Sequence, residues 1–131
     1  MRTLNLAEIE QAIRGAWCAE TCFIRKTAAP WHADNPSRGQ CGTTSLVLQD
    51  LLGGDLLVAD VTDNGEPDGV HYWNRFGSVE IDLTREQFGP THEIGEPKLV
   101  TRPPEGPRKG VLQYELLRSK VFSRLGVSEP L

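Results

Sequence analysis

Cys41 stands at a position where a thiol can act as a nucleophile. Residues 35–40 are rich in turn-forming types and lead directly to it, and residues 43–52 are predicted to form a helix that ends at Gly53-Gly54. The unpaired N–H groups and the dipole at the start of a helix favour the ionised, reactive form of a thiol. The pattern therefore predicts a nucleophilic cysteine. The alternative is a small buried cysteine without chemistry, which is the usual state of a free cysteine.

A histidine and an aspartate follow on a predicted β-hairpin. Residues 70–76 and 79–84 have strand-forming types and are separated by Gly77-Ser78, the length of a tight hairpin turn. This turn fixes the strand pairing and places alternate residues on one face. One face carries His71, Trp73, Arg75, Glu80, Asp82 and Thr84. The other, which we expect to be the core face, carries Tyr72, Phe76, Val79, Ile81 and Leu83.

Together, the cysteine and the hairpin predict a cysteine hydrolase or acyltransferase. His71 and Asp82 are diagonal neighbours, about 7 to 8 Å apart at the backbone, a gap that an imidazole and a carboxylate can bridge. Cys41 would attack a carbonyl to form a thioester, His71 would move the proton, and Asp82 would orient the imidazole. The expected substrate is an amide or ester of a peptide or a small molecule. Four further side chains are expected to bind the substrate or the oxyanion: Trp31, Asn35, Gln40 and Trp73.

A binding module without catalysis is one alternative use of these residues. It would keep the same scaffold and hold a peptide or small molecule around Trp31, His32 and Trp73. The imidazole and the carboxylate of the hairpin would then form only hydrogen bonds and ion pairs.

A zinc site is another alternative. Cys18 and Cys22 lie four residues apart, and Cys41 with His32 or His71 would complete a tetrahedral set. A single close pair of cysteines is a weak zinc signature, however. We therefore expect neither a metal nor a cofactor.

The surrounding elements predict an α+β fold in one domain. A helix is expected over residues 6–19, since a cap at Asn5 precedes apolar residues at helical spacing. Strands are expected at 55–61 and 98–102, and a last helix at 107–125. We thus expect N-terminal helices packed on a small antiparallel sheet, with a C-terminal helix. That last helix has apolar residues on more than one face, so it can dock on its own domain or join two copies in a homodimer.

The composition excludes several classes of protein. The chain has 131 residues, which suits one core, and 38% hydrophobic with 24% charged residues is typical of a globular protein. A net charge of -4 does not attract nucleic acid, so we expect no nucleic-acid partner. There is no apolar run long enough to span a membrane, and three cysteines are an odd count for a disulfide framework. We expect a cytoplasmic protein without a membrane partner.

Several separate motifs resemble the YunG-like family of small bacterial proteins. They are Trp31, Asn35-Pro36, Gly39-Gln40-Cys41, Gln49-Asp50, His71-Tyr72-Trp73-Asn74-Arg75 and Ile81-Asp82-Leu83-Thr84-Arg85-Glu86-Gln87-Phe88. The resemblance covers roughly residues 13–90 and leaves out the last helix. It implies a compact α+β domain in which Cys41, His71 and Asp82 are important, and it implies no substrate.

A looser similarity is to papain-like enzymes such as NlpC/P60 peptidases and transglutaminases. They share the order of a cysteine at a helix start, a histidine on a strand, and an acid or amide on a further strand. This similarity implies a papain-like fold and amide cleavage or acyl transfer through a thioester. The chain departs from that pattern because it is short and lacks a glutamine several residues before Cys41.

Overall fold

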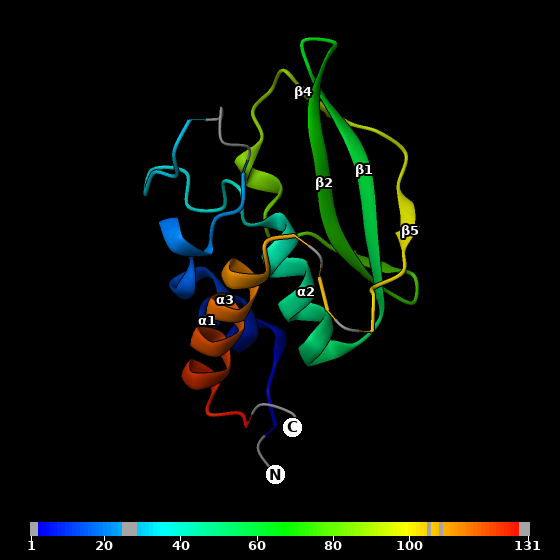
Figure 1. Cartoon of the computed structure of the whole chain (residues 1–131). Helices are drawn as coiled ribbons and strands as arrows, with labels where there is room; N and C mark the ends of the chain where they lie inside the picture. Colours follow the sequence, from blue (N-terminus) through cyan, green and yellow to red (C-terminus); the bar gives the residue numbers. More distant parts are fainter. Residues whose placement is uncertain (1–2, 25–28, 105, 108, 129–131) are drawn as a thin grey trace.

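The chain forms an α+β fold of helices packed against an antiparallel sheet. The computed structural model describes residues 3–24, 29–104, 106–107 and 109–128 (Figure 1). The helices in these residues are α1 (Leu6–Ala16), α2 (Cys41–Leu52) and α3 (Val111–Leu125). The strands are β1 (Asp55–Asp63), β2 (Glu66–Phe76), β3 (Val79–Ile81), β4 (His92–Ile94) and β5 (Lys98–Val100). Two short 3-10 turns, η1 (Ala19–Thr21) and η2 (Arg85–Gln87), complete the described elements.

The sheet is built around the long hairpin of β1 and β2. Its order is β3-β2-β1-β4, with β5 also paired to β1, and every pairing is antiparallel. The sequence predicts that β2 begins at residue 70, but the strand begins at Glu66. The reason is the turn at Asn64 and Gly65, which both have positive φ (52° and 83°) and form a two-residue hairpin loop between Asp63 and Glu66.

The second hairpin has the register that the sequence predicts. Arg75 pairs with Glu80 and Phe76 pairs with Val79. The expected distribution of burial is wrong in part, however, because His71 and Trp73 are only 0% and 6% exposed while Val79 is 57% exposed. Leu57 and Ala59 of β1 and Ile94 of β4 pack with Trp73 on the face that was expected to be polar. The sheet is therefore covered on both faces near His71.

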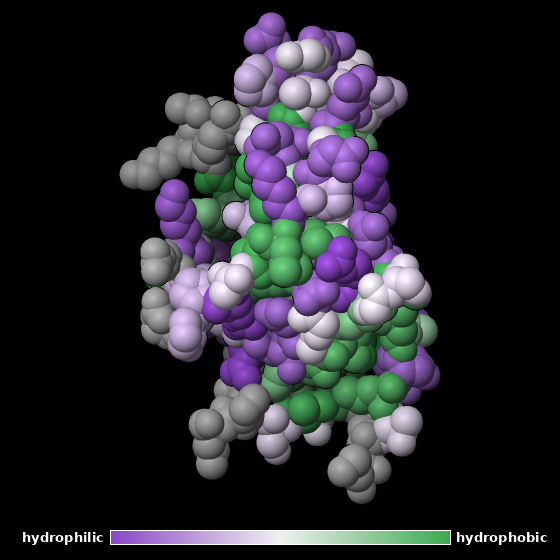
Figure 2. Space-filling model, turned by 90° about the vertical axis from the view of Figure 1, so that its right-hand side faces the viewer, coloured by the Kyte–Doolittle hydropathy of each residue, from purple (hydrophilic) through white to green (hydrophobic). Residues whose placement is uncertain are grey.

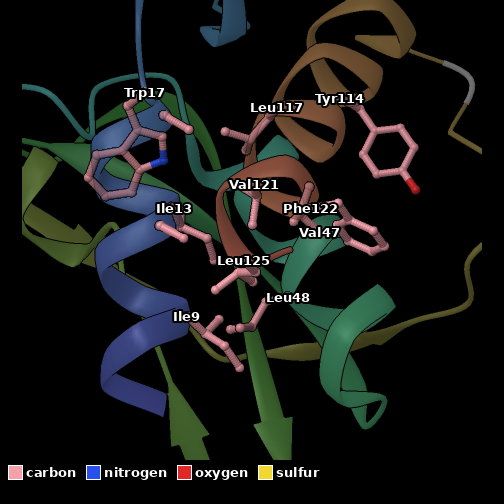
Figure 3. Packing of buried hydrophobic residues seen from close by; sticks show 12 residues of the cluster. Ile9, Ile13, Trp17, Val47, Leu48, Tyr114, Leu117, Val121, Phe122 and Leu125 are labelled. Carbon is pink, nitrogen blue, oxygen red and sulfur yellow. The ribbon is translucent and has the colours of Figure 1, made fainter. Parts of the chain in front are cut away.

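The main core lies among the three helices. Figure 3 shows apolar side chains of α1, α2 and α3 converging, and full burial of each large aliphatic side chain stabilises the fold by about 1.5–3 kcal/mol. The cluster includes Ile9, Ile13, Trp17, Val47, Leu48, Leu117, Val121, Phe122 and Leu125. The Trp17 indole N–H also donates to the Thr44 hydroxyl at 2.9 Å, which joins the end of α1 to α2. The helix that carries Cys41 is thus held by both of the other helices.

The first and last helices are shorter than expected. α1 ends at Ala16 because Trp17 has an extended backbone, with ψ at 135°. α3 starts at Val111 rather than at residue 107, since Gly110 has a left-handed conformation that α-helices do not contain. α3 docks on its own domain and leaves Leu112 (78%) and Leu116 (38%) exposed, so pairing of two copies through α3 stays a prediction.

The face toward which β5 lies in Figure 1 is shown in Figure 2. Apolar areas occupy the middle and the lower part of this face, and hydrophilic residues border them. Leu99 of β5 is one of the exposed large apolar residues, at 63% exposure. Among the described residues, no helix is both long and apolar enough to cross a membrane.

Candidate cysteine site

Cys41 is the first residue of α2 and borders a large cavity. It is partly exposed, and the cavity beside it has a volume of about 920 Å³. The helical hydrogen bonding starts with the Thr44 N–H, which donates to the Gln40 carbonyl at 2.9 Å. The N–H groups of Cys41 and Gly42 precede that bond and have no acceptor among the described residues. A Cβ added to Gly42 would meet nothing within 4 Å, so the space beside the Gly42 Cα is open.

His71 and Asp82 form the hydrogen-bonded pair that the hairpin register predicts. The imidazole Nε2 lies 2.7 Å from Asp82 Oδ2, and the two side chains are 0% and 16% exposed. The other carboxylate oxygen, Oδ1, accepts the Thr84 N–H at 3.3 Å. Arg85 lies further away, with its Nη1 at 3.8 Å from Oδ2. Asp82 is therefore held by its own turn while it binds the imidazole.

Two aromatic rings fix the plane of the His71 imidazole. Trp73 stacks on it with ring centroids 5.3 Å apart and planes 20° apart, and Phe88 meets it edge-on at 4.9 Å and 90°. The Trp73 indole N–H donates to a Glu80 carboxylate oxygen across the hairpin. The imidazole is thus buried, with Trp73 and Phe88 packed against it.

The imidazole is charged in the folded protein at neutral pH. Burial alone would lower its pKa, but the hydrogen bond and charge interaction with Asp82, together with the interaction with the neighbouring Cys41 side chain, raise the pKa of His71 from 6.5 to about 9. Since Nε2 is taken by Asp82, Nδ1 is the nitrogen left for the thiol, and it is buried without a regular hydrogen-bond partner among the described residues. Cys41 thus contributes to the raised pKa of His71, while Nδ1 forms no regular hydrogen bond among the described residues.

Gln87 holds the two halves of the site together. Its Oε1 accepts the Gly39 N–H at 3.1 Å, and its carbonyl accepts the Asn35 side-chain amide at 3.2 Å. Its own amide donates to the Thr84 carbonyl at 3.1 Å. The loop before Cys41 is therefore attached to the segment after Asp82. The sequence does not predict this role, and its only signal is that Gln87 belongs to the motif from Ile81 to Phe88.

The four residues expected to bind substrate or oxyanion lie outside the cavity lining. Gln40 is fully buried, and its amide donates to the Cys18 carbonyl at 3.0 Å while its Oε1 accepts the Thr21 hydroxyl at 2.9 Å. The Asn35 side-chain amide donates to the Gln87 carbonyl, and the Trp31 indole donates within its own loop to the Pro36 carbonyl at 2.9 Å. Trp73 stacks on the His71 ring instead. These side chains build the site and do not face the cavity, whose lining residues include none of them.

Within the part of the chain that the structure describes, the cysteines belong to no group of metal-ligating side chains. All three are free, and the Cys22 thiol donates to the Arg38 carbonyl while Lys120 donates to the Cys18 sulfur. Among the described residues, the side chains that group closely enough to hold a metal are Asp63, Asp68 and His92. His92 Nδ1 accepts the Gly89 N–H at 2.9 Å, so the proton is on Nε2, which faces Asp68 at 3.3 Å and Asp63 at 3.6 Å and does not offer a lone pair.

The described residues define a small α+β protein in which a helix-start cysteine meets a buried histidine-aspartate pair. The model of the YunG protein family matches residues 5–126, and the chain belongs to this family. The match is wider than residues 13–90 and includes the first and last helices. The chain is similar to "Uncharacterized protein YunG" of Bacillus subtilis (strain 168), with 38% identity over 66 residues that span 50% of this chain and 53% of that relative. No solved structure matches the chain at a significant level.

Proposed function

We propose that this protein is a cysteine amidase, peptidase or acyltransferase that works through a thioester on Cys41. The observation that carries the proposal is the state of His71, which is bound to Asp82 through Nε2, raised in pKa to about 9, and free of a regular partner at Nδ1 next to Cys41. An imidazolium beside a thiol favours the thiolate. The order of helix cysteine, strand histidine and following acid also supports a papain-like arrangement.

Acylation would begin with attack of the Cys41 thiolate on the carbonyl carbon of an amide or ester. The carbonyl oxygen becomes an oxyanion, and the N–H groups of Cys41 and Gly42 would donate hydrogen bonds to it. As the carbon–nitrogen or carbon–oxygen bond breaks, the His71 imidazolium gives its proton to the leaving group. The products of this half-reaction are a thioester, a neutral imidazole and a free amine or alcohol.

Deacylation would reverse these roles. Neutral His71 takes a proton from water or from an acceptor amine, which attacks the thioester carbon. The carbon–sulfur bond breaks, the acyl product leaves, and the thiolate and imidazolium are restored. Asp82 would keep Nε2 as the protonated nitrogen throughout, so that Nδ1 is the nitrogen that exchanges the proton. Trp73 and Phe88 would keep the ring in this orientation.

Selective alkylation tests the activated thiol. Iodoacetamide at pH 6, followed by mass spectrometry, should label Cys41 well ahead of Cys18 and Cys22, and His71→Ala should slow that labelling at least tenfold. His92→Ala is the matched control because it removes the other imidazole-carboxylate cluster, and it should leave the rate unchanged. Equal labelling of the three cysteines would reject an activated Cys41.

A covalent intermediate tests the chemistry itself. With p-nitrophenyl esters, the protein should release a burst of one p-nitrophenol per chain and gain the mass of one acyl group on the peptide that contains Cys41. Cys41→Ser should abolish both signals at pH 7. Release of p-nitrophenol without an acylated peptide would count against a thioester.

A binding module that keeps the same scaffold is the second candidate, and one observation favours it. Gln40 directly precedes Cys41 and carries an amide. Its side chain is buried and forms hydrogen bonds with Thr21 and Cys18. The oxyanion would therefore rely on backbone N–H groups alone. This candidate predicts ligand binding that Cys41→Ser does not change and no acyl adduct with any ester.

A further inference from the structure

The cavity beside Cys41 is lined mainly by apolar side chains from elements that are distant in the sequence. Leu46 comes from α2, Leu56 from β1, Tyr72 from β2 and Val100 from β5, and Phe23 and Ile24 close another side. A volume of about 920 Å³ is in the range of sites that take a whole small molecule. The lining therefore favours a ligand with a substantial apolar part.

Two of the four charged residues on the described lining, Arg102 and Asp68, form ion pairs within the protein. Arg102 binds Asp50 at 2.7 Å, and Tyr114 and Arg118 complete that network between α2 and α3. Asp68 lies 3.3 Å from His92. Neither group is thus a free charge for a ligand.

Arg38 is different because its charge has no carboxylate partner among the described residues. Its Nε and Nη2 both donate to the Ala29 carbonyl, at 3.3 and 3.1 Å, which fixes the guanidinium without neutralising it. It is partly buried and borders the same cavity as Cys41. A fixed, planar guanidinium in a largely apolar site is suited to binding a carboxylate.

Arg38 and the proposed nucleophile Cys41 share a neighbour, the Cys22 thiol. Both Arg38 and Cys41 influence Cys22: burial raises the pKa of the Cys22 thiol, the Arg38 charge lowers it, and Cys41 raises it. The Cys22 thiol also donates to the Arg38 carbonyl at 3.2 Å. Arg38 and Cys41 are therefore both neighbours of the Cys22 thiol, and both border the same cavity.

We propose that the cavity binds an acyl compound that has an apolar chain and a carboxylate, with the chain between α2 and the sheet and the carboxylate on Arg38. An N-acyl amino acid is the simplest compound of this class. Its amide would be the bond that Cys41 attacks, so this assignment rests on the proposed function for the reaction but not for the binding. Lys109, which is exposed and also borders the cavity, adds positive charge at its surface.

Binding to the Cys41→Ser protein tests the ligand class apart from the chemistry. Isothermal titration calorimetry would compare N-decanoylglycine with N-decanoylglycinamide, which has the same chain but no charge. We expect the carboxylate compound to bind at least tenfold more tightly. Affinity should also rise by roughly fourfold per CH₂ from the butanoyl to the decanoyl compound, as burial of the chain requires.

Arg38→Gln in the same background should reduce the preference for the carboxylate to within twofold and leave the glycinamide unchanged. Arg75→Gln is the matched control, because that arginine pairs with Asp55 and does not border the cavity. If Arg38→Gln fails to fold, Arg38→Lys keeps the charge and should show an intermediate preference.

The outcomes separate the two proposals. Equal binding of the two compounds, no binding of either, or a preference that survives Arg38→Gln overturns the ligand assignment. Binding as expected without turnover of N-decanoylglycine by the unaltered protein supports the ligand class and counts against the enzyme. An acyl adduct on Cys41 with neutral esters, but no carboxylate preference, supports the enzyme alone.

Discussion

Two histidines of this chain pair with aspartates, and they differ in what surrounds the pair. His71 is fully buried between two aromatic rings, uses one nitrogen for Asp82, and has no hydrogen-bond partner for the other among the described residues. His92 is 20% exposed, uses one nitrogen for the Gly89 N–H and shares the other between Asp63 and Asp68. Both nitrogens of His92 are thus occupied. Under the proposed function, the unpartnered Nδ1 is what makes His71, and not His92, the residue that exchanges a proton.

Removal of each imidazole is the strongest test of that contrast. We expect His71→Ala to slow acylation of Cys41 by p-nitrophenyl esters by roughly 10³-fold, because the thiol loses its proton acceptor. His92→Ala should change the rate by less than twofold. Stopped-flow measurement of the burst phase checks both variants. Similar losses in the two variants would contradict a special role for His71.

Asp82→Asn should have the next largest effect on the reaction. The amide keeps a hydrogen bond but no longer stabilises an imidazolium with Nε2 protonated, and we expect a loss of about 10²-fold in kcat/KM. Asp63→Asn is the matched change at the other cluster and should have no measurable effect. An unchanged pH profile in Asp82→Asn, with only a lower rate, would show that the carboxylate does not set the pKa of His71.

The stability of the protein should fall as the pH rises through the titration of His71. The folded pKa of about 9 exceeds the unfolded value of 6.5, so protonation stabilises the folded state. The contribution is full below pH 6.5 and is lost as the pH approaches 9, with an upper limit of roughly 3 kcal/mol from 1.36 kcal/mol per pKa unit. Urea unfolding at pH 6.5 and pH 9.5 measures the loss. His71→Ala should remove most of this pH dependence, and His92→Ala should keep it.

Of the variants at the candidate site, Gln87→Ala should have the smallest effect on the rate of acylation. The loss of two side-chain hydrogen bonds loosens the loop before Cys41 from the turn after Asp82, so we expect about a tenfold slower acylation and a free energy of unfolding lower by roughly 1–3 kcal/mol. Gln11→Ala, on the exposed face of α1, should change neither. Activity and urea unfolding are measured together, and a stability loss without any change in rate would limit Gln87 to a structural role.

The sequence was sufficient for the local geometry of the hairpin. The Gly77-Ser78 turn sets the register as far as Ile81, where β3 ends, and the predicted contact between His71 and Asp82 forms just beyond it. The helix start at Cys41 was also predictable, because turn-forming residues precede it and Gly53 ends the helix. These features depend on interactions between residues that are near in the sequence.

The surroundings of the site could not be predicted because they depend on long-range packing. From the sequence, a glutamine before a nucleophile is expected to be a free amide donor. Only the fold shows that the Gln40 side chain is hydrogen-bonded to Thr21 of η1 and to Cys18, which precedes η1. From the sequence, the face of the second hairpin that carries His71 is expected to be polar. Only the fold shows that residues of β1 and Phe88 cover this face. The same holds for Gln87, whose partners lie 48 and 52 residues away.

The connection made by Gln87 sets the order in which a nascent chain can become reactive. Cys41 leaves the ribosome well before His71, Asp82 and Gln87, so during synthesis its thiol has neither the imidazole nor the fixed loop beside it. Reactivity would therefore arise only after the second hairpin has closed and the turn that follows it has docked. Under the proposed function, a fragment that stops before residue 87 should therefore carry a Cys41 thiol that is not activated.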